Sequence, residues 1–344
     1  MSRGMVASRG VLVAGIFVAF LTPASTAGQG TEENLAPLRT AWGDPDLQGV
    51  WNNATTTPLQ RPPELAGKDT LTDEEVAQRD VQFAEARSLD RRDDEAPGLG
   101  TEPGGRLTVA DVSRAYNEFW VERGKTIANN RTSIIVDPGD GRLPPLTSDG
   151  QRRTEARVEF RRGRGPSDSW EDRRLAERCI IYRGIPAMPT LYNNNYQIAQ
   201  TPEYVAIFQE HIHEVRVIPI DGRSHLDDGV RQWLGDSRGH WEGETLVVET
   251  TNFHDQALIR GFNGGLGESL RVVERFTRVN ADSIDYQFTV IDPTTWTRPW
   301  SGSLPMTRSE GLVYEYACHE GNRGMFNLLA GARVEELGVQ PGSR

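Results

Sequence analysis

Two histidines stand two residues apart in the segment QEHIHEVRVIPIDG, residues 209–222. If this segment is a β-strand, side-chain alternation puts the imidazoles of His211 and His213 on one face, about 7 Å apart. Two imidazoles at that spacing can hold zinc, iron or copper together with a third ligand. They can also move protons, because histidine titrates near neutral pH and a carboxylate in a dry pocket can act as its partner.

A metal site would need a third ligand from another part of the chain. The candidates are His225, His240, His254, His319 or a glutamate. No spacing in the sequence fixes which of them would come close to the pair. We therefore expect no cofactor, with a divalent metal as the open alternative.

Acid–base chemistry needs fewer groups than a metal site. We predict that one histidine of the pair moves the proton and that a nearby carboxylate is its partner. The predicted catalytic residues are His211, His213, Glu214, Glu242 and Glu274. Arginines would hold a polar end of the substrate, and histidines and aromatic residues would form the walls. The predicted substrate-binding residues are Arg216, Arg223, His240, Trp241, His254, Trp296, Trp300, Tyr314 and His319.

The histidines are clustered in the sequence. Five of the six lie between residues 211 and 254, which favours a shared site. The alternative for each of them is an ordinary polar group that is satisfied by local hydrogen bonds.

A serine-based mechanism has one candidate motif, GDSRGHWEG, residues 235–243. Its first three residues resemble the opening of the GDSL-type esterase block. That block lies near the N-terminus, however, and here Asp236 and His240 flank Ser237 too closely to form a triad in that family's way. The glycine cluster GFNGGLGES follows no strand-to-helix unit, so it favours a loop over a nucleotide-binding site.

The elements that must position these residues follow a β pattern from Cys179 onward. Five runs contain alternating, β-branched and aromatic residues: NYQIAQTPEYVAIFQEHIHEVRVIPI, ETLVVETTNF, SLRVVERFTRV, SIDYQFTVID and GLVYEYACHEG. Turn signals separate them, and no helical pattern intervenes. We predict a mainly β fold, in which an antiparallel sheet forms a barrel or a sandwich.

Both faces of the predicted strand across residues 204–220 mix polar and apolar side chains. One face carries the two histidines with valines, and the other carries Glu214 and Arg216 with isoleucines. On another strand, Glu274 shares a face with apolar neighbours. Such strands are typical of a polar-lined barrel interior, although the same groups could lie on the outer face of a half-buried sheet.

Residues 28–170 are rich in proline, arginine and glycine, and we expect them to wrap the β domain with one or two helices. The clearest helix begins after Thr72, which can cap it while Glu75 completes a capping box. A second, short helix is expected in ADVSRAYNEFWVERG, residues 110–124. The run SDGQRRTEARVEFRRGRG is predicted to be a basic amphipathic helix or coil.

The first residues are typical of a secretory signal peptide. Arg3 and Arg9 precede an apolar run, and Ser25 and Ala27 occupy the positions expected before a cleavage site. The apolar run is shorter than the roughly 20 residues that cross a bilayer. We therefore expect a periplasmic or secreted protein with no membrane partner after cleavage, with an uncleaved anchor as the alternative.

These signals give four expected parts: a signal peptide (1–27), the N-terminal wrap (28–170), an antiparallel β domain (171–335) and a tail (336–344). The net charge of −11 argues against nucleic acid as a partner and leaves a small-molecule ligand. The two cysteines, Cys179 and Cys318, could form a disulfide or remain two buried thiols.

Several long blocks occur in order between Asp44 and Ala332, among them RTSIIVDPGDGRLPPLT and GDSRGHWEGETLVVETTNF. In these blocks the chain resembles a large group of exported, mostly uncharacterised bacterial proteins of acidobacterial and proteobacterial type. The resemblance implies export and a shared β architecture. It supplies neither an activity nor catalytic residues.

The patterns together predict an exported enzyme that uses acid–base chemistry on a small, partly apolar molecule in a β-barrel cavity. A lyase, an isomerase or cyclase, or a hydrolase would each fit such groups. The alternative is a periplasmic binding or carrier protein that uses the same cavity without catalysis.

Overall fold

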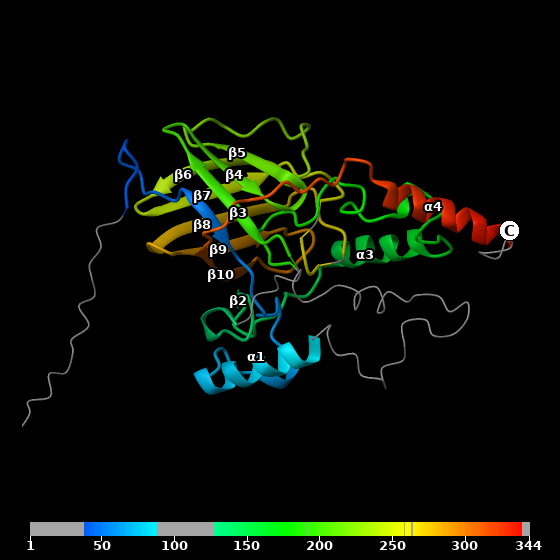
Figure 1. Ribbon diagram of the computed structural model, residues 1–344, viewed down its shortest axis with the longest axis horizontal. Coiled ribbons are helices and arrows are strands. Elements are labelled where there is room, and N and C mark those ends of the chain that lie inside the picture. The colour runs from blue at the N-terminus through cyan, green and yellow to red at the C-terminus, as the bar shows by residue number, and fades with distance from the viewer. Residues whose placement is uncertain (1–37, 88–126, 191, 258, 263, 339–344) are drawn as a thin grey trace, which may run out of the picture. The chain divides into compact units, whose positions relative to one another are not determined.

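The structure is a computed structural model that describes residues 38–87, 127–190, 192–257, 259–262 and 264–338 (Figure 1). These residues form a mainly β fold with ten strands in one sheet. The strands are β1 (Gly49–Asn52), β2 (Ile135–Asp137), β3 (Asn195–Gln200), β4 (Tyr204–Gln209), β5 (Glu214–Pro219), β6 (Asp236–Glu242), β7 (Thr245–Thr251), β8 (Arg271–Asn280), β9 (Ser283–Ile291) and β10 (Trp300–Arg308).

All neighbouring strands of the sheet run antiparallel, in the order β5-β4-β3-β1-β10-β9-β8-β7-β6, and β2 pairs with β10 beside this path. The sheet curls until it is nearly closed into a barrel. The predicted mainly β class is therefore confirmed.

The two end strands, β5 and β6, approach each other through side chains, since the described strands have no hydrogen-bonded ladder there. Gly239 on β6 permits this approach. A Cβ atom at that position would lie 2.9 Å from Ile220 and 3.1 Å from Ile218. Any larger residue would push the two strands apart, because those distances are shorter than van der Waals contact.

Ring systems fill much of the inner face of the barrel. Each of the following is at most 1% exposed: Trp51, Tyr196, Phe276, Tyr286, Phe288 and Trp300. Because alternate residues of each strand point inward, these rings come from five different strands and pack in one core.

The prediction of one continuous strand across residues 204–220 is wrong. β4 ends at Gln209 and β5 begins at Glu214, and the short 3-10 turn η5 (His211–His213) joins them into a hairpin. Ile212 in this turn has a φ of 57°, which is unusual for a β-branched residue. The turn changes the register, so the two histidines do not share a strand face and Arg216 faces inward.

Two further strand assignments differ from the sequence-based expectation. The run GLVYEYACHEG, residues 311–321, has no regular strand, and β6 coincides with the motif GDSRGHWEG rather than with one of the predicted runs. β10 also lay outside the predicted runs, because its small and proline residues obscure the β pattern.

Three α-helices are described: α1 (Asp73–Arg87), α3 (Ser148–Arg161) and α4 (Arg323–Glu336). The predicted capping box of α1 is confirmed. The Thr72 amide donates to Glu75 Oε2 at 2.9 Å, and the Glu75 amide donates to Thr72 Oγ1 at 3.3 Å. The predicted helix at residues 110–124 and the predicted signal peptide lie outside the described residues. Short 3-10 helices occur at η1 (Pro63–Leu65), η3 (Ala128–Asn130) and η4 (Trp170–Asp172).

The N-terminal half contributes to the barrel itself. β1 lies between β3 and β10, and β2 pairs with β10, so the sheet draws strands from both sides of residue 170. A disulfide joins Cys179 to Cys318, with an S–S distance of 1.99 Å. It ties the beginning of the segment before β3 to the irregular segment that follows β10.

Candidate functional site

Residues 179–190 and 192–194, which we call the plug segment, contact inner-face tyrosines at one end of the barrel. The Ala187 amide donates to Tyr286 Oη at 2.8 Å, and Arg183 Nη1 donates to Tyr196 Oη at 2.7 Å. Both tyrosines belong to the inner face of the barrel. Isoleucines and a methionine of the plug segment are buried beside them. The plug segment thus meets the η5 turn at the same end of the barrel.

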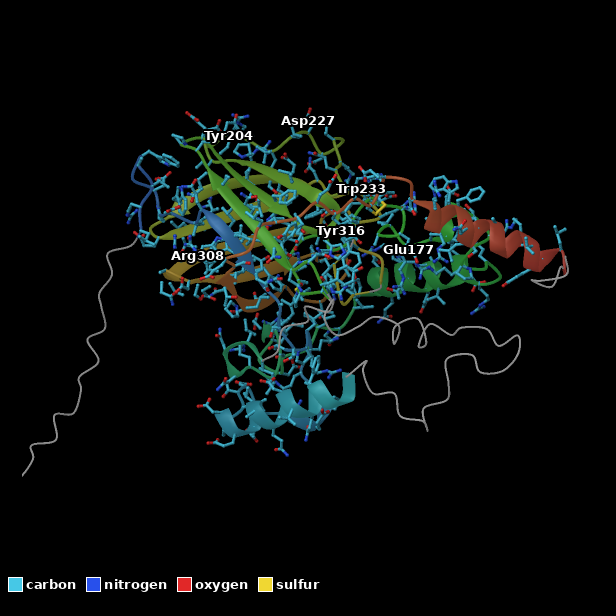
Figure 2. All side chains as sticks on the ribbon, in the orientation of Figure 1. Glu177, Tyr204, Asp227, Trp233, Arg308 and Tyr316 are labelled. Atoms are coloured by element: carbon cyan, nitrogen blue, oxygen red, sulfur yellow. A yellow bond between two sulfur atoms is a disulfide. The ribbon has the colours of Figure 1, made fainter. Side chains whose placement is uncertain are left out.

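His211 lies in the η5 turn and is only 1% exposed. Its ring stacks on Tyr182 of the plug segment, with 3.8 Å between centroids and 7° between planes. Tyr192 at 5.1 Å and Tyr316 at 4.7 Å complete what we call the tyrosine cage (Figure 2 labels Tyr316). Neither nitrogen of the ring has a hydrogen-bond partner of good geometry among the described residues.

The surroundings of His211 keep it neutral. Burial, and next the positive charge of Arg183, lower the pKa of His211 to about 3, and the Tyr192 backbone opposes the shift. A neutral imidazole can still donate or accept a hydrogen bond. At physiological pH it would therefore orient a bound group or stabilise a charge by a hydrogen bond, and it would not take up a second ring proton.

Glu214 is the first residue of β5, directly after the turn that holds His211. Both of its carboxylate oxygens are buried, and neither has a hydrogen-bond partner of good geometry in the described part of the chain. Burial raises the pKa of Glu214 to about 7, and the Tyr182 backbone and the charges of Arg183 and Arg216 oppose that rise. A carboxyl group with such a pKa can both release and accept a proton near neutral pH.

Arg183 brings a positive charge into the plug segment at 1% exposure. Besides Tyr196, its guanidinium donates to Thr190 Oγ1 at 2.9 Å and to the backbone oxygens of Tyr192 and Asn193. No carboxylate among the described residues forms an ion pair with it, and its buried Nε has no partner there. Neutral oxygens alone therefore surround this charge, although burying an ion without a counter-ion is costly.

Arg260 also lies close to Tyr182. Its Nε donates to the Pro189 carbonyl at 2.8 Å, and its guanidinium carbon lies 5.7 Å from the centroid of the Tyr182 ring. Within the described residues its two Nη atoms make neither a hydrogen bond nor an ion pair. This half-buried guanidinium can therefore accept an additional partner.

A pocket of about 640 Å³ lies beside Arg260, and we call it the Arg260 pocket. Its walls are residues 55–59, 188–190 and 260–261, together with Phe83 and Ile134. Small-molecule sites typically enclose about 300–1,000 Å³, with mostly apolar walls and a few polar groups. Gly261 has a φ of +87°, and a Cβ atom there would lie 2.4 Å from Leu59, so glycine is required for this wall.

Arg216 and Glu274, both predicted site residues, pair with each other inside the barrel. Arg216 Nη1 lies 2.5 Å and Nη2 3.3 Å from the two oxygens of Glu274, whose side chain is fully buried. Tyr286 donates to the same carboxylate at 2.7 Å. Burial and the Glu274 carboxylate raise the pKa of Tyr286 well above its ordinary value, so its hydroxyl stays a donor. This network links β5, β8 and β9. Among its buried side-chain polar atoms, Arg216 Nε is the one without a hydrogen-bond partner in the described part of the chain.

Several predicted site residues lie on the outer surface instead. His240 and Glu242 are neighbours on the exposed face of β6, with 3.1 Å between His240 Nε2 and Glu242 Oε1. Hydrogen bonds from Arg275 and then from His240 lower the pKa of Glu242. Arg223 is also exposed and pairs with Asp221. None of these residues takes part in the tyrosine cage or lines the Arg260 pocket.

The segment between β10 and α4 exposes two further predicted residues. Tyr314 is 70% exposed, and His319 is exposed near the disulfide. Tyr316 of this segment contacts His211, with 4.7 Å between ring centroids.

The predicted tryptophans serve mainly as core. Trp296 and Trp300 are at most 1% exposed and meet edge to face, with 5.8 Å between ring centroids. Trp241 packs against the same core from β6. They therefore line neither the tyrosine cage nor the Arg260 pocket.

The remaining histidines are dispersed. His254 stacks on Trp233 and lies beside Asp255, and His225 Nδ1 lies 2.9 Å from Asp236. The side chain of His213 is outside the described part of the structure. Across the described residues, no group of three or more His, Cys, Asp or Glu side chains could hold a metal ion.

The esterase-like motif does not form a triad. Ser237 is buried in β6, and its Oγ lies 2.9 Å from Thr250 Oγ1. Asp236 contacts His225 and Arg238 rather than His240. The serine thus has a structural partner and no histidine base beside it.

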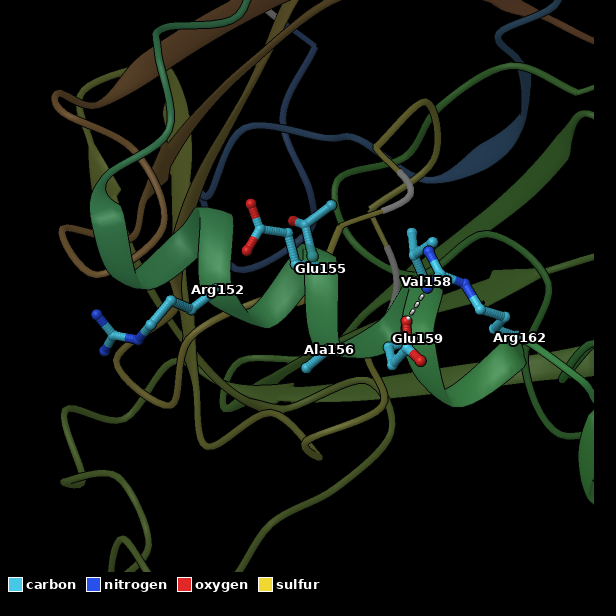
Figure 3. A pocket seen from close by; sticks show the side chains of 7 residues that line it. Arg152, Glu155, Ala156, Val158, Glu159 and Arg162 are labelled. Atoms are coloured by element: carbon cyan, nitrogen blue, oxygen red, sulfur yellow. Dashed lines mark ion pairs between the residues drawn. The ribbon is translucent and has the colours of Figure 1, made fainter.

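A second hollow, of about 620 Å³, runs along the outside of α3 (Figure 3). Three of its charged side chains form ion pairs within the helix and its ends, since Arg162 pairs with Glu159 at 2.9 Å and Arg152 with Asp149 at 2.8 Å. One helix alone lines this hollow, so it lacks the opposing walls that enclose a ligand.

The sequence-based prediction missed the residues that surround His211. These are Tyr182, Arg183, Tyr192, Arg260 and Tyr316. A usable signal was present for one of them, because Arg183 interrupts the otherwise apolar run IIYRGIPAMP. A buried arginine in such a run indicates a paired or functional charge. For the other four, nothing in the local pattern indicates proximity to residue 211.

No known family model, curated protein or solved structure matches this chain. Within the described residues, no helix has the length and apolar character needed to cross a membrane. The geometry described above is therefore the basis for a functional hypothesis.

Proposed function

We propose that this protein is an enzyme that moves a proton on a small, partly apolar molecule, with Glu214 as the group that transfers it. The observation that carries the proposal is the pair of buried, unpartnered groups Glu214 and His211 at one end of the barrel. Perturbed titratable groups of this kind are concentrated at functional sites, where burial tunes them for proton transfer.

The two groups would take different roles. Glu214, with a pKa of about 7, would abstract a proton from the substrate and return it to a second atom or to the leaving group. His211 stays neutral and would hydrogen-bond to the polar atom at which charge develops. This division fits a lyase, an isomerase or cyclase, or a hydrolase.

Access would be gained on the side of Tyr316. This half-buried ring covers His211 and belongs to the irregular segment between β10 and α4, which the disulfide holds at Cys318. Displacing one side chain from an irregular segment breaks no strand pairing. The substrate would enter there, or from the Arg260 pocket past Tyr182.

The proposed location is outside the cytoplasm. The predicted signal peptide at residues 1–27 supports export, and the Cys179–Cys318 disulfide fits an oxidising compartment.

The direct test is deuterium exchange into a panel of carbon acids incubated with the protein in heavy water, followed by mass spectrometry. We expect exchange by the wild-type protein and a loss of about 10²- to 10⁴-fold in Glu214→Gln. Glu203→Gln is the matched control, because that glutamate is exposed on the loop before β4. Full exchange by Glu214→Gln would sink the proposal.

One observation favours a second function, a binding or carrier protein. Neither His211 nor Glu214 is among the residues that line the Arg260 pocket. If the protein binds small molecules there but promotes no exchange in any of them, the carrier function replaces the enzyme.

A further inference from the structure

We propose that the Arg260 pocket binds a small organic carboxylate, whose charge pairs with Arg260 and whose apolar part lies against the opposite wall. The inference deepens the proposed function, since the bound molecule would be the substrate at its entry site, before it passes Tyr182 to reach Glu214, which does not line this pocket. It can nevertheless be tested by binding alone.

The first observation that supports this inference is the pair of arginines, Arg183 and Arg260, near Tyr182. Arg183 follows Tyr182 in the chain, and Arg260 lies near the Tyr182 ring. After burial, the positive charges of both arginines also lower the pKa of His211. Neither guanidinium forms an ion pair within the described residues. Glu214 feels the charge of Arg183 but is largely neutral below pH 7, because burial raises its pKa to about 7. Glu210, the buried residue before His211, accepts a hydrogen bond from Asn195 at 2.8 Å, and within the described residues it forms no ion pair with either guanidinium.

The pocket also supplies the donors that a carboxylate needs. Arg260 keeps both Nη atoms without a described partner, and a guanidinium can bind a carboxylate through two parallel hydrogen bonds. Thr190, which lines the pocket, accepts a hydrogen bond from Arg183 at 2.9 Å. Thr190 would thus be the side chain that separates an anion in the pocket from the buried charge of Arg183.

The remaining walls select an organic anion over an inorganic one. The apolar residues that line the pocket are Leu59, Ile134, Met188 and Phe83. Ile134 and Met188 are at most 2% exposed. Burying an apolar group against such walls contributes about 25 cal/mol per Å². A ligand with a carboxylate at one end and a short apolar body would use both parts of the site.

The test compares phenylbutyrate with phenylbutyramide, which has nearly the same shape but no charge, by calorimetry on the full chain. We expect phenylbutyrate to bind at least about 10-fold more tightly than the amide, because a charged hydrogen bond replaces a neutral one. Inorganic phosphate should bind more weakly than phenylbutyrate, since it gains nothing from the apolar wall.

Variants assign the effect to Arg260. In Arg260→Gln, the preference for phenylbutyrate over the amide should disappear, a loss of about 10- to 100-fold in affinity for the carboxylate. Arg152→Gln, which removes an exposed arginine on α3, should bind like the wild type. Circular dichroism and a thermal melt check that each variant folds. If Arg260→Gln does not fold, Arg260→Lys and the wild-type comparison of the two probes decide the question.

Three outcomes would overturn the inference. They are equal binding of the acid and the amide, an unchanged preference in Arg260→Gln, and no binding of phenylbutyrate up to its solubility limit. Binding without any deuterium exchange would instead uphold this inference and reject the enzyme function. Exchange that depends on Glu214 but shows no preference for carboxylates would do the reverse.

Discussion

The segment from His211 to Glu214 and the outer face of β6 contain the same two residue types at nearly the same spacing, yet they offer opposite chemistry. In the first segment, the polar atoms of His211 and Glu214 are buried without described partners, and burial drives their pKa values to about 3 and about 7. On β6, His240 and Glu242 bond to each other in solvent, and Arg275 and His240 lower the pKa of Glu242. Water and counter-ions stabilise the charged forms outside, whereas burial removes that stabilisation inside.

The difference between inside and outside can be measured with matched substitutions, the largest effect first. Glu274→Ala removes the carboxylate that neutralises Arg216 in the barrel core. Leaving a buried charge without its partner typically costs about 3–5 kcal/mol, so the free energy of unfolding should fall by that amount. Glu242→Ala on the outer face should leave stability nearly unchanged. Urea denaturation of both variants checks this, and similar losses in the two would contradict the contrast.

The second comparison concerns pH. The folded-state pKa of Glu214 is raised to about 7 from its ordinary value of 4.5, so the folded protein binds a proton more readily than the unfolded chain. Below pH 4.5 both states are protonated and there is no penalty. Between pH 4.5 and 7 stability falls as pH rises, and above about pH 7 the full loss, about 3 kcal/mol, is present.

Glu214→Gln removes this dependence. The variant should match the wild type near pH 4.5 and be more stable than it at pH 8, by up to about 3 kcal/mol. Glu203→Gln should follow the wild type at every pH. Denaturation midpoints across this pH range give the difference directly. A constant offset between Glu214→Gln and wild type would mean that Glu214 titrates normally.

The smallest effect is expected for one hydroxyl. Tyr286 accepts a hydrogen bond from the Ala187 amide and donates one to Glu274, so Tyr286→Phe leaves two buried groups short of a partner. The expected loss of stability is about 1–3 kcal/mol. The control is Tyr204→Phe, whose hydroxyl accepts only from the exposed Arg223. Equal melting temperatures for the two variants would show that the plug segment is not tied to the barrel in this way.

How far the sequence predicts the fold can be seen at two elements. The capping box of α1 was readable because its two partners, Thr72 and Glu75, are three residues apart. The β4–β5 hairpin was not readable, because its turn places Ile212 rather than glycine or asparagine in the left-handed region. Because the turn contains no typical turn residue, the sequence of two strands was read as one strand. The predicted face of the histidines assumed that side chains alternate without a break, and the turn interrupts that alternation.

The candidate site shows the same division. The sequence drew attention to the His211–Glu214 segment, where two histidines and a carboxylate lie among valines and isoleucines. It could not separate Glu214 from Glu242, because both follow β-type residues and a histidine. Burial separates them, and burial depends on the plug segment and on Tyr316, which lies far along the chain.

The sequence by itself determined the mainly β class and the start of α1, since each depends on residues close together along the chain. The tertiary structure decided which groups lie inside. Closure of the barrel brought Arg216 to Glu274, and the plug segment brought Tyr182 to His211 of the η5 turn and to Arg260. Desolvation and neighbouring charge set what a carboxyl or an imidazole can do, and both arise only when distant segments pack together.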